Sequence, residues 1–88
     1  MATIPKIKSI KPIPPTGLLV LFDNGCERIY DCTNILDLPS FRLLKDPAFF
    51  KTVRVDIGGY GIIWNDDIDL SEYELWTNGK EIVQDSLA

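Results

Sequence analysis

The stretch GLLVLFDNGCERIYD, residues 17–31, decides the fold. Its first six residues are apolar on both faces of an extended chain, which predicts a strand covered on both sides. Asn24-Gly25 follows it. An Asn-Gly pair between two apolar runs predicts a β-hairpin with a type I′ turn, because both central residues of that turn need a positive φ. The return strand is expected over residues 26–31.

Two further extended segments flank this hairpin in the sequence. Residues 4–13 alternate apolar residues with lysines and are interrupted by prolines, which predicts a broken strand at the edge of a sheet. Residues 52–56 alternate around Val53 and Val55, and a glycine-rich stretch, residues 58–61, then turns the chain into a second apolar run over 62–64. This order predicts a second hairpin. A phosphate-binding loop is the weaker interpretation of the glycines, because no Lys-Ser/Thr pair follows them.

Residues 33–50 change from strand-like to helical spacing. Ser40 and Asp46 can cap two short helical turns, and Pro47 stands where a first helical residue would stand. The segment is therefore expected to cross over and cover the sheet. Its aromatic residues are expected to fill the core; they are Phe41, Phe49 and Phe50.

A short final helix is predicted after residue 70. Ser71 with Glu74 forms a capping box, in which each side chain bonds the backbone amide of the other residue. Leu75 and Trp76 would form the apolar face of this helix, and Gly79 its end. Calcium is the competing interpretation of the acidic stretch before the helix, but the glycine and the glutamate of a calcium loop are missing from it.

Together these signals predict a small α+β domain. It would hold a mostly antiparallel sheet of about five strands, formed by two hairpins and an N-terminal edge strand, with short helices. At 88 residues the chain is expected to be a single domain over residues 1–88, with 80–88 a frayed tail.

The residue inventory excludes several classes of function. The chain has no histidine, so Ser-His-Asp and Cys-His catalysis and the commonest metal ligand are absent together. Cys26 and Cys32 are too few for a structural zinc site and are expected to be free thiols. Asp66 with Asp69 is the only plausible catalytic pair, and such solvated carboxylates show no acid–base tuning, so we expect no enzyme, no metal and no cofactor. No apolar run is long enough for a membrane span or a signal peptide, which leads us to expect a cytoplasmic protein.

Charge is distributed unevenly along the chain. Residues 1–54 hold eight basic and five acidic side chains, a net of +3, whereas residues 55–88 hold one basic and eight acidic side chains, a net of −7. Such a split predicts a dipolar surface whose acidic end meets a basic partner. The alternatives are that the two halves interleave in space, or that the basic half makes the protein a nucleic-acid-associated adaptor. A nucleic-acid partner is the less expected one on an acidic protein.

The acidic half also supplies the candidate site. We expect a small protein partner to be bound there, with carboxylates that steer its approach and aromatic side chains that anchor it. Tyr73 and Trp76 lie near this site in sequence. The predicted partner-binding residues are Tyr60, Trp64, Asp66, Asp67, Asp69, Glu72 and Glu74.

The order of these motifs resembles a known family. It runs from the Phe-Asp-Asn-Gly hairpin through Phe41-x-x-Leu44-x-Asp46-Pro47-x-x-Phe50, Val53-x-Val55-Asp56 and Ile62-x-Trp64-Asn65 to Ile68-Asp69-Leu70 and the final helix. The chain is similar over nearly its whole length to the small bacterial family of domains of unknown function numbered 2442. Many members carry Trp-Pro-x-Gly where this chain has Trp64-Asn65-Asp66-Asp67.

The resemblance implies a small α+β fold without established catalytic residues. Some relatives append a helix-turn-helix domain, which we expect to be missing here because nine residues follow Gly79. Others are encoded beside a second small family, numbered 4160, as a proposed toxin–antitoxin couple. An antitoxin-like interaction module is thus the function that the resemblance implies.

Overall fold

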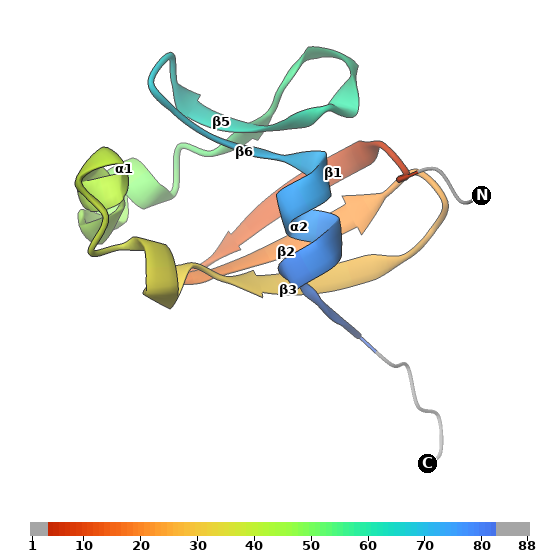
Figure 1. Ribbon diagram of the computed structural model, residues 1–88, viewed down its shortest axis with the longest axis horizontal. Helices are drawn as coiled ribbons and strands as arrows, with labels where there is room; N and C mark the ends of the chain where they lie inside the picture. Colours follow the sequence, from red (N-terminus) through yellow and green to blue (C-terminus); the bar gives the residue numbers. More distant parts are fainter. Residues whose placement is uncertain (1–3, 83–88) are drawn as a thin grey trace.

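The computed structural model describes residues 4–82, and their strands form two antiparallel sheets (Figure 1). Sheet A has the strand order β1-β2-β3-β7 and sheet B the order β4-β5-β6. The predicted α+β class is confirmed, although the strands divide into sheets of four and three instead of forming one sheet of about five. The strands are β1 (Ile7–Ile13), β2 (Gly17–Phe22), β3 (Glu27–Asp31), β4 (Arg54–Val55), β5 (Gly61–Asn65), β6 (Ile68–Ser71) and β7 (Lys80–Glu81).

The β2–β3 hairpin forms as predicted, but its turn is of another kind. Gly25 has a φ of 90°, while Asn24 keeps a negative φ, so the expected type I′ turn is wrong. The loop has three residues, closed by bonds from the Phe22 amide to the Cys26 carbonyl (2.9 Å) and from the Gly25 amide to the Phe22 carbonyl (3.0 Å). The Asn24 side chain accepts the Cys26 amide at 3.0 Å. This turn therefore needs only one residue with a positive φ, Gly25. The Asn24 side chain accepts the Cys26 amide, which would otherwise lack a partner in the turn.

Strand β2 is buried on one face only. Leu18, Val20 and Phe22 are completely buried, whereas Leu19 and Leu21, which point to the other face, are half-buried. The expectation that this strand is covered on both sides is therefore wrong for its second face. The buried face lies under α2 (Glu72–Asn78), which crosses in front of sheet A in Figure 1.

Three short helical segments join the two sheets, as the crossover prediction required: η1 (Cys32–Ile35), η2 (Pro39–Lys45) and α1 (Pro47–Phe50). Asp46 caps α1 by accepting the Ala48 amide at 3.0 Å, which confirms the predicted cap. The predicted Ser40 cap is wrong. Helix η2 already begins at Pro39, so Ser40 lies inside it, and the N-cap residue is Leu38, whose side chain cannot accept a hydrogen bond. Phe50 is buried, and Phe41 and Phe49 pack against the core.

Sheet B contains a hairpin that the sequence did not predict. The expected β4–β5 hairpin is present, with η3 (Ile57–Gly59) in its loop. Strand β6 then pairs antiparallel with β5. The sequence analysis predicts no strand for this acidic stretch before the final helix. Its turn is closed by the Asn65 side chain, which accepts the amides of Asp67 (2.8 Å) and Ile68 (2.9 Å).

Helix α2 confirms half of the predicted capping box. Ser71 accepts the Glu74 amide at 3.1 Å, but the Glu74 carboxylate turns the other way and accepts the Tyr30 hydroxyl at 2.7 Å. After the helix ends at Gly79, Lys80 pairs with Ile29 of β3, so the frayed tail is wrong for the two residues of β7. Residues 83–88 of the expected tail lie outside the described residues.

Candidate functional site

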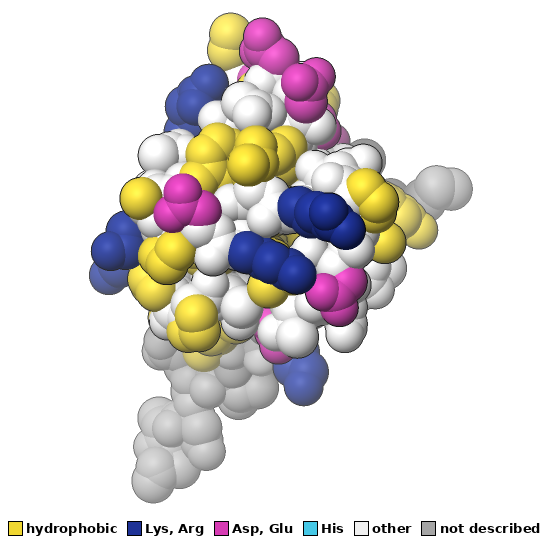
Figure 2. Space-filling view, turned by 90° about the vertical axis from the view of Figure 1, so that its left-hand side faces the viewer, with side chains coloured by type: hydrophobic (Ala, Val, Ile, Leu, Met, Phe, Trp, Pro, Cys, Tyr) yellow, Lys and Arg dark blue, Asp and Glu magenta, His cyan; other side chains and the backbone are white. Residues whose placement is uncertain are grey.

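Five carboxylates of the candidate site lie along sheet B and its flanking turns, and we call them the acidic surface. Asp66 and Asp67 are exposed in the β5–β6 turn, Asp69 is exposed on β6, and Glu72 is half-exposed at the start of α2. Asp56, exposed before η3, joins them, although the sequence interpretation did not include it. In Figure 2 acidic side chains gather at the top of the molecule, where Figure 1 places sheet B, and Lys and Arg side chains cross the middle.

The predicted anchor Trp64 does not belong to this surface. Its side chain is 3% exposed and packs in the core, where its ring centroid lies 6.2 Å from that of Phe50. The indole Nε1 donates to the Phe50 carbonyl at 3.0 Å. Trp64 thus ties β5 to the end of α1, and its place in the partner-binding set is corrected to a core residue.

Glu74 and Trp76 also turn toward the body of the domain. Glu74 is half-buried and holds the Tyr30 hydroxyl. Trp76 is half-buried, with its ring edge-on to Phe22 (centroids 5.0 Å apart) and the Arg28 guanidinium 3.8 Å from the ring centre. These two residues fix α2 onto sheet A, and neither is freely presented to a partner.

Three large apolar side chains next to the acidic surface are open to solvent. Ile57 is 93% exposed in η3, Tyr60 59% exposed after it, and Tyr73 60% exposed on α2. The Glu72 amide donates to the Tyr60 carbonyl at 2.9 Å, which brings the η3 loop against the start of α2. Tyr60 was predicted as part of the site and Tyr73 as near it, whereas Ile57 was missed. Its place between Asp56 and two glycines predicts a turn, and a turn exposes such a side chain; this was the signal in the sequence.

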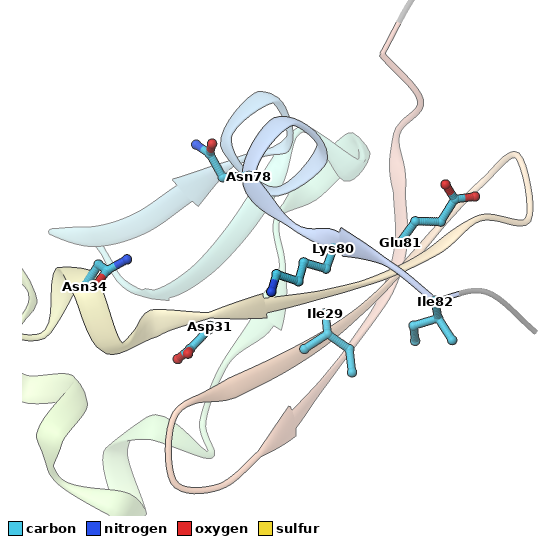
Figure 3. A pocket seen from close by; sticks show the side chains of 7 residues that line it. All are labelled: Ile29, Asp31, Asn34, Asn78, Lys80, Glu81 and Ile82. Carbon is cyan, nitrogen blue, oxygen red and sulfur yellow. The ribbon is translucent and has the colours of Figure 1, made fainter.

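A separate pocket of about 560 Å³ opens at the β3 and β7 side of sheet A (Figure 3). It combines two asparagine amides, three charged side chains and two isoleucines. Asp31 is bonded to the amide and hydroxyl of Thr33, and these bonds hold the pKa of its carboxyl below the usual value. Its charge is thus used to cap η1. The lining residues are Ile29, Asp31, Asn34, Asn78, Lys80, Glu81 and Ile82.

Two potentially nucleophilic side chains of sheet A and η1, Tyr30 and Cys32, are buried. Burial raises the pKa of the Cys32 thiol to about 12, and the pKa of Tyr30 is raised by burial and by its bond to Glu74. Both therefore stay protonated at neutral pH. Cys26 and Cys32 are free thiols, as predicted. Among residues 4–82 no three His, Cys, Asp or Glu side chains come together as a metal site.

These features define a class: a small two-sheet α+β domain with an acidic surface and exposed apolar side chains. Residues 7–81 match the model of DUF2442, a family described as proteins of unknown function, and the chain belongs to that family.

No curated protein and no solved structure matches the chain. Over the part of the chain that the structure describes, no helix is long and apolar enough to cross a membrane.

Proposed function

We propose that the domain is an interaction module that binds a basic protein partner on its acidic surface. The observation that supports this most strongly is the almost completely exposed Ile57 beside Asp56. Tyr60 and Tyr73 lie on the two segments that the bond from the Glu72 amide to the Tyr60 carbonyl joins. Exposed apolar side chains rimmed by charge are typical of protein interaction sites. In such an arrangement the carboxylates speed the encounter with the partner, and the apolar side chains supply the affinity.

The charge of the surface specifies the kind of partner. Asp56, Asp66, Asp67, Asp69 and Glu72 lie along sheet B, against a single basic residue of that sheet, Arg54. The Arg54 guanidinium is engaged with the Trp64 carbonyl at 3.4 Å. A basic protein is therefore the complementary partner. Restraint of such a partner in the bacterial cytoplasm, as an antitoxin restrains its toxin, is the role that we propose for the complex.

The test compares two variants with the same change of charge. Asp66, Asp67 and Asp69 are replaced by Asn in one, and the matched control carries Asp23→Asn, Asp37→Asn and Glu81→Gln, which lie outside the acidic surface. Both are exposed sets, so neither should unfold the domain. Each tagged protein is isolated from its native host at low and moderate salt, and co-isolated protein is identified and quantified.

We expect one near-stoichiometric basic protein with the natural chain and with the control, and its loss from the Asp66/Asp67/Asp69 variant. Recovery of the domain alone would contradict the proposal. Recovery of nucleic acid, retained by both variants and lost at moderate salt, would instead favour the adaptor function of the basic half.

A further inference from the structure

Tyr60 already carries a cation in the free domain. The Lys6 ammonium lies over the Tyr60 ring, 4.5 Å from its centre, and the ring remains 59% exposed. No carboxylate lies within ion-pair distance of Lys6 among residues 4–82, so the ring is the contact that the structure gives this ammonium. The electron-rich face of a tyrosine attracts a cation.

The backbone around Tyr60 is built so that Lys6 reaches the ring. Gly59 has a φ of 78°, and a Cβ at this position would stand 2.6 Å from the Ile7 carbonyl and 3.1 Å from the Lys6 Cβ. Only glycine permits this approach of η3 to the segment before β1. The Lys6 carbonyl is itself fixed, because it accepts the Asp23 amide at 2.8 Å. The Lys6 ammonium and the Tyr60 ring, which are far apart in sequence, are thereby held in contact.

We propose that the face of Tyr60 is a seat for a cationic side chain, filled by Lys6 in the free protein and by an arginine or lysine of the basic partner in the complex. This inference rests on the proposed function and names the contact that would anchor the partner. Asp56 and Ile57 precede Tyr60 in the same loop, and the Glu72 amide donates to the Tyr60 carbonyl, so acidic and apolar residues belong to the two segments that meet at Tyr60. Lys6 then acts as an internal competitor that the partner has to displace.

The competition is weak enough to be overcome. An exposed contact of a cation with an aromatic ring changes an affinity by about two- to fivefold. Removal of Lys6 should therefore tighten binding by this factor and no more. Net charge alone also changes when a lysine is removed, so the experiment needs a control with the same loss of charge. Lys8, exposed on β1 and over no ring among residues 4–82, provides it.

The probe is a short peptide that alternates arginine with leucine and glycine, and its neutral counterpart has citrulline in place of arginine. Binding to the natural chain, to Lys6→Gln and to Lys8→Gln is followed by NMR titration. We expect Lys6→Gln to bind the arginine peptide about two- to fivefold more tightly than Lys8→Gln. The citrulline peptide should show no such difference. In a Tyr60→Leu background the two lysine variants should become equal, because the seat is gone.

The outcomes separate this inference from the function on which it rests. If the peptide binds and depends on Asp69 and Glu72, but Lys6→Gln and Lys8→Gln behave alike, the cation seat is wrong and the acidic surface stands. If the same difference persists in Tyr60→Leu, Lys6 acts through something other than the ring and the seat is again wrong. If the arginine peptide binds no variant, both the seat and the basic-partner function are overturned.

Discussion

The two tryptophans belong to two differently built halves of the molecule. Trp64, under sheet B, is enclosed by the core and donates its N–H to a main-chain carbonyl. Trp76, on α2, lies on sheet A with Phe22 at its ring and the Arg28 guanidinium stacked over it. Trp64 is a core residue whose N–H is satisfied within the core, whereas Trp76 covers sheet A and has a charged side chain stacked on its ring.

The difference shows how one residue type can serve two purposes in a small domain. A buried indole needs a hydrogen-bond acceptor, and the Phe50 carbonyl at the end of α1 supplies one. A half-buried indole needs none, and the stacked Arg28 guanidinium, which also donates to the Gly79 carbonyl at 3.4 Å, completes its cover. We therefore expect the free energy of unfolding to be more sensitive to substitution of Trp64 than to substitution of Trp76.

Replacement of Trp64 should have the largest effect. Trp64→Ala would remove a fully enclosed ring and leave a cavity, at a cost of about 3–5 kcal/mol in the free energy of unfolding. Urea denaturation followed by circular dichroism measures this. As a control, Trp64→Phe keeps an aromatic ring and loses the bond to the Phe50 carbonyl, so it should cost about 1–3 kcal/mol. A cost below 1 kcal/mol for Trp64→Ala would contradict the enclosed position of this side chain.

Replacement of Trp76 should cost less. Because its ring is only half-buried, Trp76→Ala should lower the free energy of unfolding by about 2 kcal/mol, from lost apolar burial and the lost Arg28 stack. The matched control on the same helix is Tyr73→Ala, whose side chain is 60% exposed and should change stability by less than about 0.5 kcal/mol. The same urea titrations apply. If Trp64→Ala and Trp76→Ala lowered the free energy of unfolding equally, the expected difference between the two tryptophans would be wrong.

Alkaline pH should destabilise the domain through two buried groups, Tyr30 of β3 and Cys32 of η1. The pKa of the Cys32 thiol is raised from 9.0 to about 12 in the folded state, so the folded state binds the extra proton. Its contribution to stability is complete below pH 9 and is lost as the pH rises from 9 toward 12. Between pH 9 and 10 we expect a loss of about 1 kcal/mol.

Denaturation at several pH values, with the natural chain and with Cys32→Ala, tests this loss. Cys32→Ala should be less stable at neutral pH but should lose less stability between pH 9 and 10. Tyr30 adds to the decline above pH 10, since its pKa is raised as well, and Tyr30→Phe should remove that addition. An unchanged slope in both variants would show that these buried groups do not govern the alkaline limit.

The sequence predicted the features that depend on local chemistry. The β2–β3 hairpin follows from Asn24-Gly25, and the start of α1 from Asp46-Pro47. The turn between β5 and β6 was missed because Asn65-Asp66-Asp67 contains no glycine and the carboxylates resemble a helix start. Only the side chain of Asn65, folded back on two amides, makes this turn possible.

The candidate site was predicted in part, since four of its five carboxylates and Tyr60 are at the surface, whereas Glu74 and Trp64 turn inward. Burial of Trp64 depends on Phe50, which is brought to it by a crossover that no local pattern specifies. Glu74 likewise turned inward because Tyr30, 44 residues away, offers it a hydroxyl. Long-range contacts of this kind decide which side chains of an acidic segment a partner can meet.

The two-residue strand β7 has a consequence for the order of folding. It adds to β3 at Arg28 and Ile29, and the Arg28 guanidinium reaches the Gly79 carbonyl 51 residues away. Such a contact closes a long loop, and its entropic cost must be met before the few bonds of β7 contribute. The β2–β3 hairpin can form early from neighbouring residues, whereas we expect β7 to join it late, once sheet B and α2 have shortened the loop. The edge of sheet A at β7 is then where we expect the folded domain to open first.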